Sequence, residues 1–280
     1  MFTIVEKRNL APQVFLLVID APLVARKAQP GQFVIVRVSD DGERIPLTIA
    51  DYNAPKGTVS LIVQAVGATT IQLCALEAGD MICDFVGPLG KPSEFHNVKR
   101  VLCVGGGVGT AVVYPQVKML HAQGVKVDVV IGGRTRDLLI LVDELRAVCD
   151  NLYLATNDGS AGVQGMVTDV VKQLLDNGEQ YDEAVAIGPM IMMKVVCGLT
   201  REYGLKTMVS MNPIMVDGTG MCGGCRLTVG GKTVYACVDG PDFDGHQVDF
   251  DEAMRRAGMY KEEEAHQCNL LNKGGNGHGA

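Results

Sequence analysis

Three cysteines near the C-terminal end of the sequence have a spacing suited to binding iron. Cys222 and Cys225 form a Cys-x2-Cys pair in the glycine-rich stretch Asp217-Gly-Thr-Gly-Met-Cys222-Gly-Gly-Cys225. The run 226–237 alternates on either side of two adjacent glycines, which predicts a hairpin that returns Cys237 to the pair. Thiolates gathered in this way hold iron-sulfur clusters, which carry single electrons.

An aspartate occupies the position of the fourth cluster ligand. The plant-type pattern is Cys-x4-Cys-x2-Cys with a distant fourth cysteine, and its first position falls on Asp217. We therefore predict a [2Fe-2S] cluster on Asp217, Cys222, Cys225 and Cys237, with a reduction potential shifted by the carboxylate. Two alternatives stay open: a zinc site in which His246 could serve as a ligand, and ordinary reduced cysteines in a glycine-rich turn.

The composition is that of an intracellular enzyme. The chain has 280 residues, of which 47% are hydrophobic, so two modest domains and a small third one can bury cores. A net charge of −7 without basic runs argues against nucleic acid or an anionic membrane as a partner. Nine scattered cysteines indicate reduced thiols, and the N-terminus lacks the features of a signal peptide. We therefore expect a cytoplasmic protein without a membrane span.

Residues 1–97 are predicted to form an antiparallel β-barrel. Short alternating runs separated by Pro, Gly and Asp support this prediction: Phe2 to Glu6, Val14 to Asp20, Phe33 to Val38, Val59 to Val66 and Met81 to Val86. The segment Arg44 to Ala50 lies between two of them. Gly67-Ala-Thr69-Thr70 could begin a helix capped by either threonine. The free N–H groups at the start of such a helix suit a pyrophosphate, although a threonine there is commonly a cap alone.

Residues 98–210 are predicted to form an α/β unit that binds a nucleotide. An apolar strand runs into Gly105-Gly-Gly-Val-Gly109-Thr110 and then a helix, which suits a phosphate, although a tight turn would explain these glycines too. Further parallel strands are predicted at Val125 to Gly132, Leu152 to Thr156 and Ala184 to Ile187. Ligands bind where such strands end. Candidate contacts there are Gly132, Gly133, Arg134, Asn157, Asp158, Gly188, Pro189 and Met190.

The order of these motifs resembles that of ferredoxin-reductase-like proteins with a C-terminal [2Fe-2S] domain. The matching motifs are Arg44 to Ala50, Gly67 to Thr70, Gly87 to Gly90, Gly105 to Thr110, Asn157 to Ser160, Gly188-Pro189 and the cysteine motif. The resemblance implies an FAD-binding β-barrel domain (1–97), an NAD(P)-binding α/β domain with a parallel sheet (98–210), and a [2Fe-2S] domain with a C-terminal tail (211–280). The family includes electron-transfer subunits of dihydroorotate dehydrogenase. Those subunits have cysteine at the position of Asp217. An aspartate there resembles instead the ligand set of the small subunits of electron-bifurcating NADH-dependent reduced ferredoxin:NADP⁺ oxidoreductases, also called sulfide dehydrogenases.

The same resemblance implies which residues hold the two organic cofactors. The residues expected around FAD are Ile45, Pro46, Leu47, Thr48, Ile62, Val63, Gln64, Thr69 and Thr70. Those expected around NAD(H) are Gly105, Gly106, Gly107, Val108, Gly109, Thr110, Arg134, Asn157, Asp158, Gly188, Pro189 and Met190. Related reductases place an arginine three residues before the Ser/Thr, but that position is Ile45 here, and Arg44 precedes it.

An electron-transfer subunit is the function that the resemblance implies. NAD(H) would exchange hydride with FAD, and FAD would exchange single electrons with the cluster. The cluster would connect to a larger glutamate-synthase-like flavoprotein subunit with [4Fe-4S] clusters, which would reach ferredoxin and NADP(H). No acid-base dyad is required. The alternatives are a subunit of an NAD-linked dihydroorotate dehydrogenase or another NADH-dependent reductase, and a metal-stabilised nucleotide-binding regulator.

The C-terminal region is predicted to contain a charged helix and a tail. Residues Asp249 to Gln267 are charged and compatible with a helix that covers the cluster domain, meets the partner, or is simply solvated. Residues Lys273 to Ala280 are rich in Gly and Asn, which is typical of a disordered tail.

Overall fold

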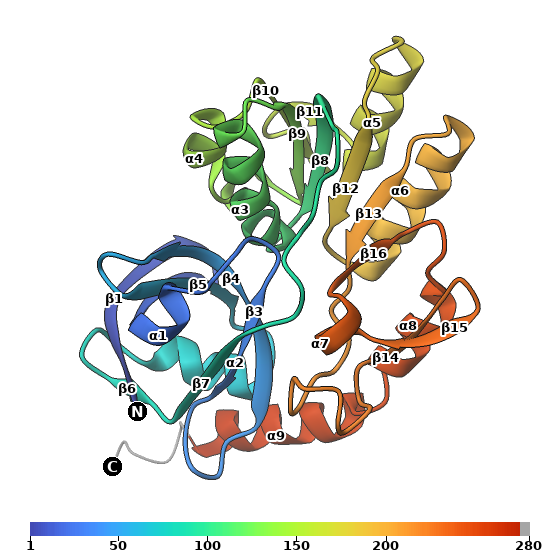
Figure 1. Ribbon diagram of the computed structural model, residues 1–280. Coiled ribbons are helices and arrows are strands. Elements are labelled where there is room, and N and C mark those ends of the chain that lie inside the picture. The colour runs from blue at the N-terminus through green and yellow to red at the C-terminus, as the bar shows by residue number, and fades with distance from the viewer. Residues whose placement is uncertain (275–280) are drawn as a thin grey trace.

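The computed structural model describes residues 1–274. Its first unit is a nearly closed antiparallel barrel (Figure 1). Its seven strands have the order β6-β1-β2-β5-β4-β3-β7. They are β1 (Phe2–Ala11), β2 (Val14–Asp20), β3 (Phe33–Arg37), β4 (Arg44–Asn53), β5 (Thr58–Gln64), β6 (Met81–Ile82) and β7 (Asp84–Leu89). Two helices accompany them, α1 (Pro22–Ala25) and α2 (Ala68–Ala75). The prediction of a β-barrel is thereby confirmed.

Alternating apolar side chains fill the barrel. Ile4, Leu17, Ile19, Val36 and Leu61 are all at most 1% exposed and belong to one core. Ile4, Leu17, Ile19 and Leu61 alternate along their strands with more exposed neighbours, whereas Val36 lies in β3, where Ile35 is buried as well. The run Met81 to Val86, predicted as one strand, is two short strands instead, β6 against β1 and β7 against β3.

Strand β4 was not among the predicted strands, and Pro46 explains why. Proline has no N–H for a sheet, so it argues against a central strand. In the structure Pro46 lies opposite Ile35 of β3, whereas pairing with β5 begins only at Ile49, opposite Leu61. The first half of β4 is therefore paired on one side, and Pro46 belongs to that half. Its other side is open to a ligand.

The second unit is a sheet of seven strands in the order β11-β10-β9-β8-β12-β13-β16. All neighbours are parallel except β16, which is antiparallel to β13. The strands are β8 (Arg100–Gly106), β9 (Lys126–Gly133), β10 (Asn151–Thr156), β11 (Val163–Gln164), β12 (Glu183–Ile187), β13 (Thr207–Ser210) and β16 (Asp242–Asp244). The three additional parallel strands expected here are confirmed as β9, β10 and β12. The predicted parallel-sheet unit is likewise confirmed.

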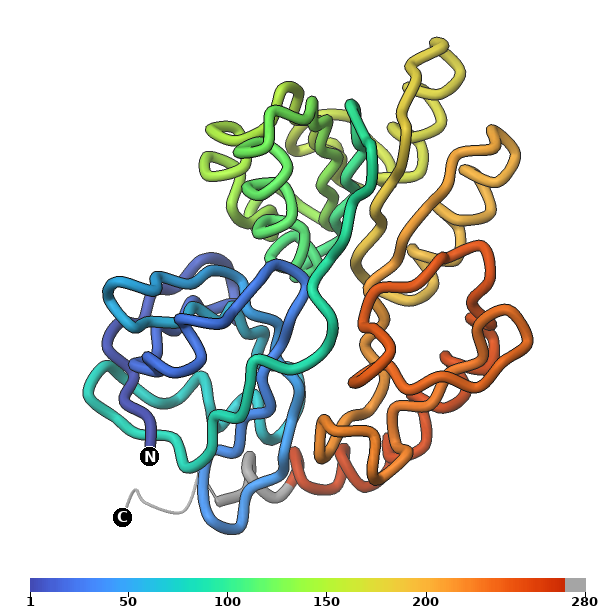
Figure 2. The backbone as a smooth tube through the Cα atoms, in the orientation of Figure 1, coloured from blue at the N-terminus to red at the C-terminus, as the bar shows by residue number. Residues whose placement is uncertain are grey.

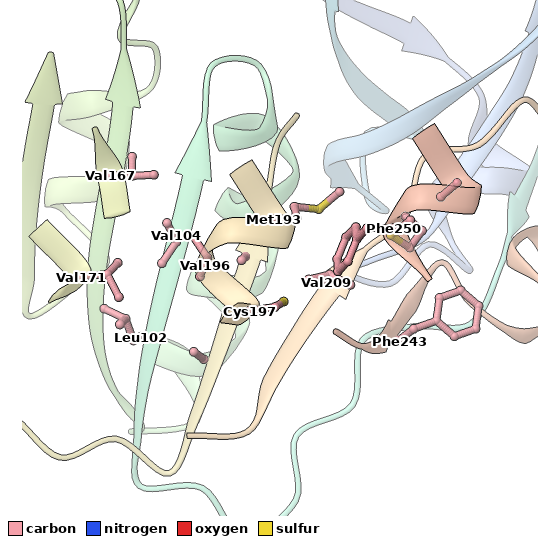
Figure 3. Close-up of a cluster of buried hydrophobic side chains, with 14 of the residues drawn as sticks. Leu102, Val104, Val167, Val171, Met193, Val196, Cys197, Val209, Phe243 and Phe250 are labelled. Atoms are coloured by element: carbon pink, nitrogen blue, oxygen red, sulfur yellow. The ribbon is translucent and has the colours of Figure 1, made fainter. Parts of the chain in front are cut away.

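Helices cover both faces of this sheet. Along β8, Val101 and Cys103 pack with α3 (Gly109–Ala122) and α4 (Val142–Arg146). Leu102 and Val104 point the other way, toward α5 (Val167–Asp176) and α6 (Met190–Glu202), as Figure 3 shows. A short 3-10 helix, η1 (Arg136–Leu138), follows β9. Chain order reverses between β8 and β12, and such a point is where open α/β sheets bind ligands.

The C-terminal segment lies beside both units (Figure 2). It contains the hairpin β14 (Arg226–Val229) and β15 (Lys232–Tyr235), then α7 (Ala236–Asp239), α8 (Phe250–Ala257) and α9 (Lys261–Gly274). The predicted hairpin is confirmed, with Gly230 and Gly231 both at positive φ in its turn. The predicted terminal helix is two helices. Helix α9 runs below the molecule toward the barrel (Figure 1), and residues 275–280 of the predicted tail lie outside the described residues.

The third predicted domain shares a sheet with the second. Strand β16 follows the cysteine motif in sequence, yet it pairs with β13 and extends the second sheet. The domain boundaries at residues 97 and 210 therefore remain a proposal. Within residues 1–274, no helix combines the length and the apolar character needed to cross a membrane.

Candidate functional site

Two adjoining cavities open at the point where the chain order of the second sheet reverses. The larger has a volume of about 550 Å³ and the smaller about 410 Å³. Five residues line both: Gln64, Gly106, Gly107, Val108 and Pro189. A molecule in one cavity would therefore lie next to a molecule in the other.

The smaller cavity lies between the barrel, the second sheet and the C-terminal segment. The barrel contributes Phe33, Pro46, Leu47, Thr48, Ile62 and Gln64, and the segment after β13 contributes Ser210, Met211, Asn212 and Met215. These walls are largely apolar and carry a few hydroxyl and amide groups, as ring-shaped cofactors require. Because the unpaired half of β4 forms one wall, the residues fit the flavin that was expected there.

The larger cavity suits a nucleotide with phosphate groups. Arg134 is its single charged lining residue within the described part of the chain, and no carboxylate lines it there. Asn157 and Thr168 add polar groups, and glycines at the ends of β8 and β9 keep the backbone accessible. An arginine without a facing carboxylate attracts a phosphate. The residues therefore fit NAD(H).

Close backbone packing explains the glycine turn after β8. A Cβ atom at Gly109 would lie 2.3 Å from the carbonyl oxygen of Ile187 and 2.7 Å from Cα of Gly188. A Cβ atom at Gly106 would lie 2.4 Å from Sδ of Met192. The turn therefore packs closely against the end of β12, and both line the smaller cavity.

Most of the expected cofactor residues come together at these cavities. Those that line one or both cavities are Pro46, Leu47, Thr48, Ile62, Gln64, Gly106, Gly107, Val108, Gly109, Arg134, Asn157, Gly188 and Pro189. The remaining expected residues line neither: Ile45, Val63, Thr69, Thr70, Gly105, Thr110, Asp158 and Met190. The assignment of individual contacts remains a prediction.

Several of the residues outside the cavities have structural contacts of their own. Val63 is 1% exposed in the barrel core, and Thr110 is 2% exposed. Asp158 accepts hydrogen bonds from the backbone N–H and hydroxyl of Ser160, which keep the pKa of its carboxyl low. Val63 therefore packs in the barrel core, Thr110 is buried in α3, and Asp158 holds the loop after β10.

Neither of the threonines predicted to cap α2 is its N-cap residue, although Thr70 makes a capping-box bond. The N-cap is Gly67, and Thr70 lies in the first turn, where its hydroxyl accepts a hydrogen bond from the N–H of Gly67 at 2.9 Å. Thr69 donates to a carboxylate oxygen of Glu43 at 3.0 Å. The predicted N-cap position was wrong because glycine also serves as an N-cap, and sequence alone does not distinguish the cap from the first turn.

Sequence reasoning missed the lining residues that precede the cysteine motif. Ser210 ends β13, so the rule that ligands gather at strand ends could have found it. Met211, Asn212 and Met215 follow in an irregular segment, and Phe33 belongs to the barrel. No local pattern marks these four residues as cavity residues.

The cysteine motif folds as predicted into a loop and a hairpin, and two of its thiols meet. Sγ of Cys225 and Sγ of Cys237 are 3.2 Å apart, and both residues are buried. Sulfur ligands at about 2.3 Å in a tetrahedron lie about 3.7 Å apart, so the two sulfurs would have to move slightly apart to hold one metal atom. Burial, followed by the hydrogen bond with Cys225, raises the pKa of the Cys237 thiol.

The other two expected ligands lie in the same loop in a different arrangement. The Asp217 carboxylate accepts hydrogen bonds from the backbone N–H groups of Thr219 and Cys222, which lower the pKa of its carboxyl. Cys222 is exposed. Among the described residues, no three His, Cys, Asp or Glu side chains already surround one point as metal ligands would. The donor set fits a cluster with carboxylate and thiolate ligands, provided that Cys222 and Asp217 turn toward the buried pair.

His246, the additional ligand of the zinc alternative, has other neighbours. Its Nε2 lies 3.1 Å from the hydroxyl of Thr200 on α6, and its carbonyl oxygen accepts a hydrogen bond from Arg201. This arrangement does not support the zinc alternative.

A shielded carboxylate lies behind the smaller cavity. Asp242 accepts a hydrogen bond from the hydroxyl of Ser93 at 2.5 Å, and the amide nitrogen of Gln116 approaches to 3.4 Å. One oxygen of Asp242 and the amide oxygen of Gln116 have no hydrogen-bond partner. Burial raises the pKa of this carboxyl. A proton on Asp242 would provide the missing donor.

We expect the Asp242→Asn variant to be more stable than the wild type at neutral pH. Because the folded pKa lies above the ordinary value of 3.8, the native state holds the proton more tightly than the unfolded chain. The stability that protonated Asp242 contributes to the folded state is therefore complete below about pH 4, and it declines as the pH rises toward the folded pKa. Asparagine keeps a donor at every pH, which should recover about 1–3 kcal/mol, the cost of an unsatisfied buried group.

Thermal unfolding of both proteins between pH 4 and pH 8 tests this expectation. The two curves should converge at low pH and separate as the pH rises. Asp143, whose side chain is 91% exposed, provides the control substitution Asp143→Asn. A wild type whose stability relative to Asp242→Asn does not change with pH would contradict the assignment.

Comparison with known proteins identifies relatives along the whole chain. The model of the iron-sulfur cluster binding domain of dihydroorotate dehydrogenase B matches residues 212–249. A Thermotoga maritima protein, named as a homolog of the electron transfer subunit of dihydroorotate dehydrogenase B (NAD(+)), is 49% identical and matches 93% of this chain and 92% of its own length. An uncharacterized Clostridium beijerinckii protein encoded in the adh 3′ region is 54% identical, with 94% and 92% covered.

A solved structure gives the same result in three dimensions. A chain from the structure of NADH-dependent reduced ferredoxin-NADP oxidoreductase, reported for flavin-based electron bifurcation, superimposes with a TM-score of 0.92. It is 47% identical, and the match covers 97% of this chain and 98% of that chain. This chain therefore belongs to the ferredoxin-reductase-like family of electron-transfer subunits, which includes the dihydroorotate dehydrogenase B electron-transfer subunits and their relatives.

Proposed function

We propose that this chain is the FAD and [2Fe-2S] subunit of an electron-bifurcating NADH-dependent ferredoxin:NADP⁺ oxidoreductase. In this role it exchanges electrons with NAD(H) and passes them singly to a larger flavoprotein subunit. Bound FAD would link the two-electron chemistry of the nicotinamide to one-electron transfer through the cluster. The 47% identity to a chain of such an oxidoreductase supports this reading over the whole length.

The observation that carries the proposal is the meeting of three parts of the chain at two joined cavities. Gln64, Gly106, Gly107, Val108 and Pro189 line both cavities, so a nicotinamide and a flavin ring would be adjacent. The smaller cavity is closed by the segment that leads from Ser210 to Met215, two residues before Asp217. The proposed cluster ligands thus follow directly from the flavin wall.

The residues of the chain have distinct tasks in this function. Arg134 would hold the dinucleotide phosphates, and the glycines after β8 would let them approach the backbone. Pro46 and Leu47 would contact the ring of the flavin, while Thr48 and Gln64 would offer it hydrogen bonds. The buried Cys225 and Cys237 would anchor the cluster, and Asp217 and Cys222 would complete it.

Exposed apolar side chains around the cysteine loop support a protein partner on this side. Met221 is 88% exposed, and Val216, Val238 and Tyr235 are 46%, 44% and 37% exposed. Apolar patches of this kind mark protein interfaces. We propose that a glutamate-synthase-like flavoprotein subunit with [4Fe-4S] clusters docks here and transfers electrons onward to ferredoxin and NADP⁺.

A second candidate is the electron-transfer subunit of an NAD-linked dihydroorotate dehydrogenase. The cluster-domain match to dihydroorotate dehydrogenase B over residues 212–249 favours it. Aspartate at position 217 argues for the first candidate, because the dihydroorotate enzymes have cysteine there, as the sequence resemblance implied.

Co-expression with each candidate partner separates the two functions. We expect this chain to co-purify with the glutamate-synthase-like subunit and to couple NADH, ferredoxin and NADP⁺ in that complex. Co-purification with a dihydroorotate-oxidising subunit instead, with NADH formed from dihydroorotate, would establish the second candidate and reject the first.

A further inference from the structure

Arg44 links the flavin wall of the barrel to the cysteine loop. Its Nε donates a hydrogen bond to the carbonyl oxygen of Val216 at 2.9 Å. Arg44 begins β4, two residues before the cavity residue Pro46. Val216 lies directly between the cavity residue Met215 and the expected cluster ligand Asp217. A single side chain thus joins both walls where the cavity ends and the loop begins.

The charge of Arg44 is only partly balanced by its neighbours. Asp84 accepts from Arg37 at 2.7 Å and from Arg44 at 3.3 Å, so two guanidinium groups share one carboxylate. Asp40 forms a longer contact of 3.9 Å with Arg37 and is 90% exposed. Because the closer partner of Asp84 is Arg37, positive charge remains on the side of Arg44 that faces the loop.

The loop is packed against the barrel beside this contact. A Cβ atom at Gly218, whose φ is +79°, would lie 2.6 Å from Cδ1 of Leu89 and 3.0 Å from Cγ1 of Ile35. The residue after Asp217 is therefore in close contact with β3 and β7. A loop held this closely keeps the guanidinium at a fixed place relative to the expected ligands.

We propose that Arg44 is a positioning residue that holds the cluster loop and raises the reduction potential of the cluster. This inference rests on the proposed function, because it requires the cluster. The expected ligand set of three thiolates and one carboxylate is anionic, and reduction adds one more negative charge. A nearby cation stabilises the reduced form more than the oxidised form. Partial burial strengthens the effect, since the Arg44 side chain is only 30% exposed.

The test is a redox titration of the purified chain with dithionite, followed by EPR of the [2Fe-2S] signal. Arg44→Gln removes the charge and should lower the equilibrium constant for reduction about tenfold, or about 59 mV for one electron. Arg44→Lys keeps a charge and should recover most of this loss. Arg37→Gln is the matched control, because Arg37 shares Asp84 but donates to the carbonyl of Asp40 and not to the loop. Its shift should be less than half as large.

The possible results decide the inference in each case. An unchanged reduction potential in Arg44→Gln, or an equal shift in Arg37→Gln, overturns the inference about Arg44. The proposed function stands in that case, provided that the wild type has the [2Fe-2S] signal. Loss of iron from Arg44→Gln, with iron retained in Arg44→Lys and Arg37→Gln, supports the positioning role. Loss of iron from all three variants overturns it. A wild type without a [2Fe-2S] signal rejects the proposed function and this inference together.

Discussion

Replacing Cys237 with alanine is expected to lower the iron content of the chain by more than tenfold while the flavin remains bound. The thiol is buried 3.2 Å from that of Cys225, so its removal breaks the one pair of ligands that is already assembled. The flavin wall at Pro46 and Leu47 belongs to the barrel and does not depend on the thiol. NADH should therefore still bleach the flavin, whereas the [2Fe-2S] EPR signal should be lost.

The matched control is Cys197→Ala. Cys197 belongs to the same core as Cys237, and both residues are 3% exposed, so each substitution removes a buried sulfur. Iron analysis, flavin absorption and stopped-flow reduction by NADH separate the effects. Iron retained in Cys237→Ala, or lost equally in Cys197→Ala, would contradict the assignment of Cys237 as a ligand.

A substitution of Gly109 by alanine should abolish most of the NADH-dependent reduction of the flavin. The new Cβ would overlap the carbonyl of Ile187 and Cα of Gly188, and backbone atoms cannot rotate away as a side chain can. The turn after β8 must then shift, which displaces the nucleotide relative to the flavin. A displacement of about 1 Å can slow a reaction on the order of 100-fold, and overpacking costs about 1–3 kcal/mol of stability.

Gly124→Ala provides the comparison for this experiment. Gly124 has a φ of +75°, but a Cβ there meets nothing within 4 Å, and the residue lines neither cavity. This variant should lose about 1 kcal/mol of stability and keep its rate of reduction by NADH. A Gly109→Ala protein that folds and is reduced by NADH at the wild-type rate would show that the turn does not position the nucleotide.

Much of the fold could be predicted because its elements have strong local patterns. The alternating runs at Val14 to Asp20 and Phe33 to Val38, and the continuous apolar strands of the second unit, identified most of both sheets. Strand β4 was missed because Pro46 argues against a strand unless one side of it is unpaired. The three-residue strand β16 has no pattern of its own, since its pairing with β13 is decided by the tertiary structure.

The candidate site was predictable where a rule connects sequence to position. Arg134, Asn157 and Pro189 follow predicted strands, and all three line the larger cavity. Phe33 and Met215 were not predictable, because each reaches the smaller cavity through packing between units far apart in the sequence. The contact between Arg44 and Val216 was hidden for the same reason, since 172 residues separate them.

Anaerobic titration of the purified chain with NADH, followed by visible absorption and EPR, tests the central claim most directly. The account predicts about one FAD and about two irons per chain, bleaching of the flavin by NADH, and a [2Fe-2S] signal whose g-values change in Asp217→Cys. Zinc in place of iron, or flavin bleaching without any [2Fe-2S] signal, would contradict the claim that this chain passes electrons from NADH through a flavin to a cluster.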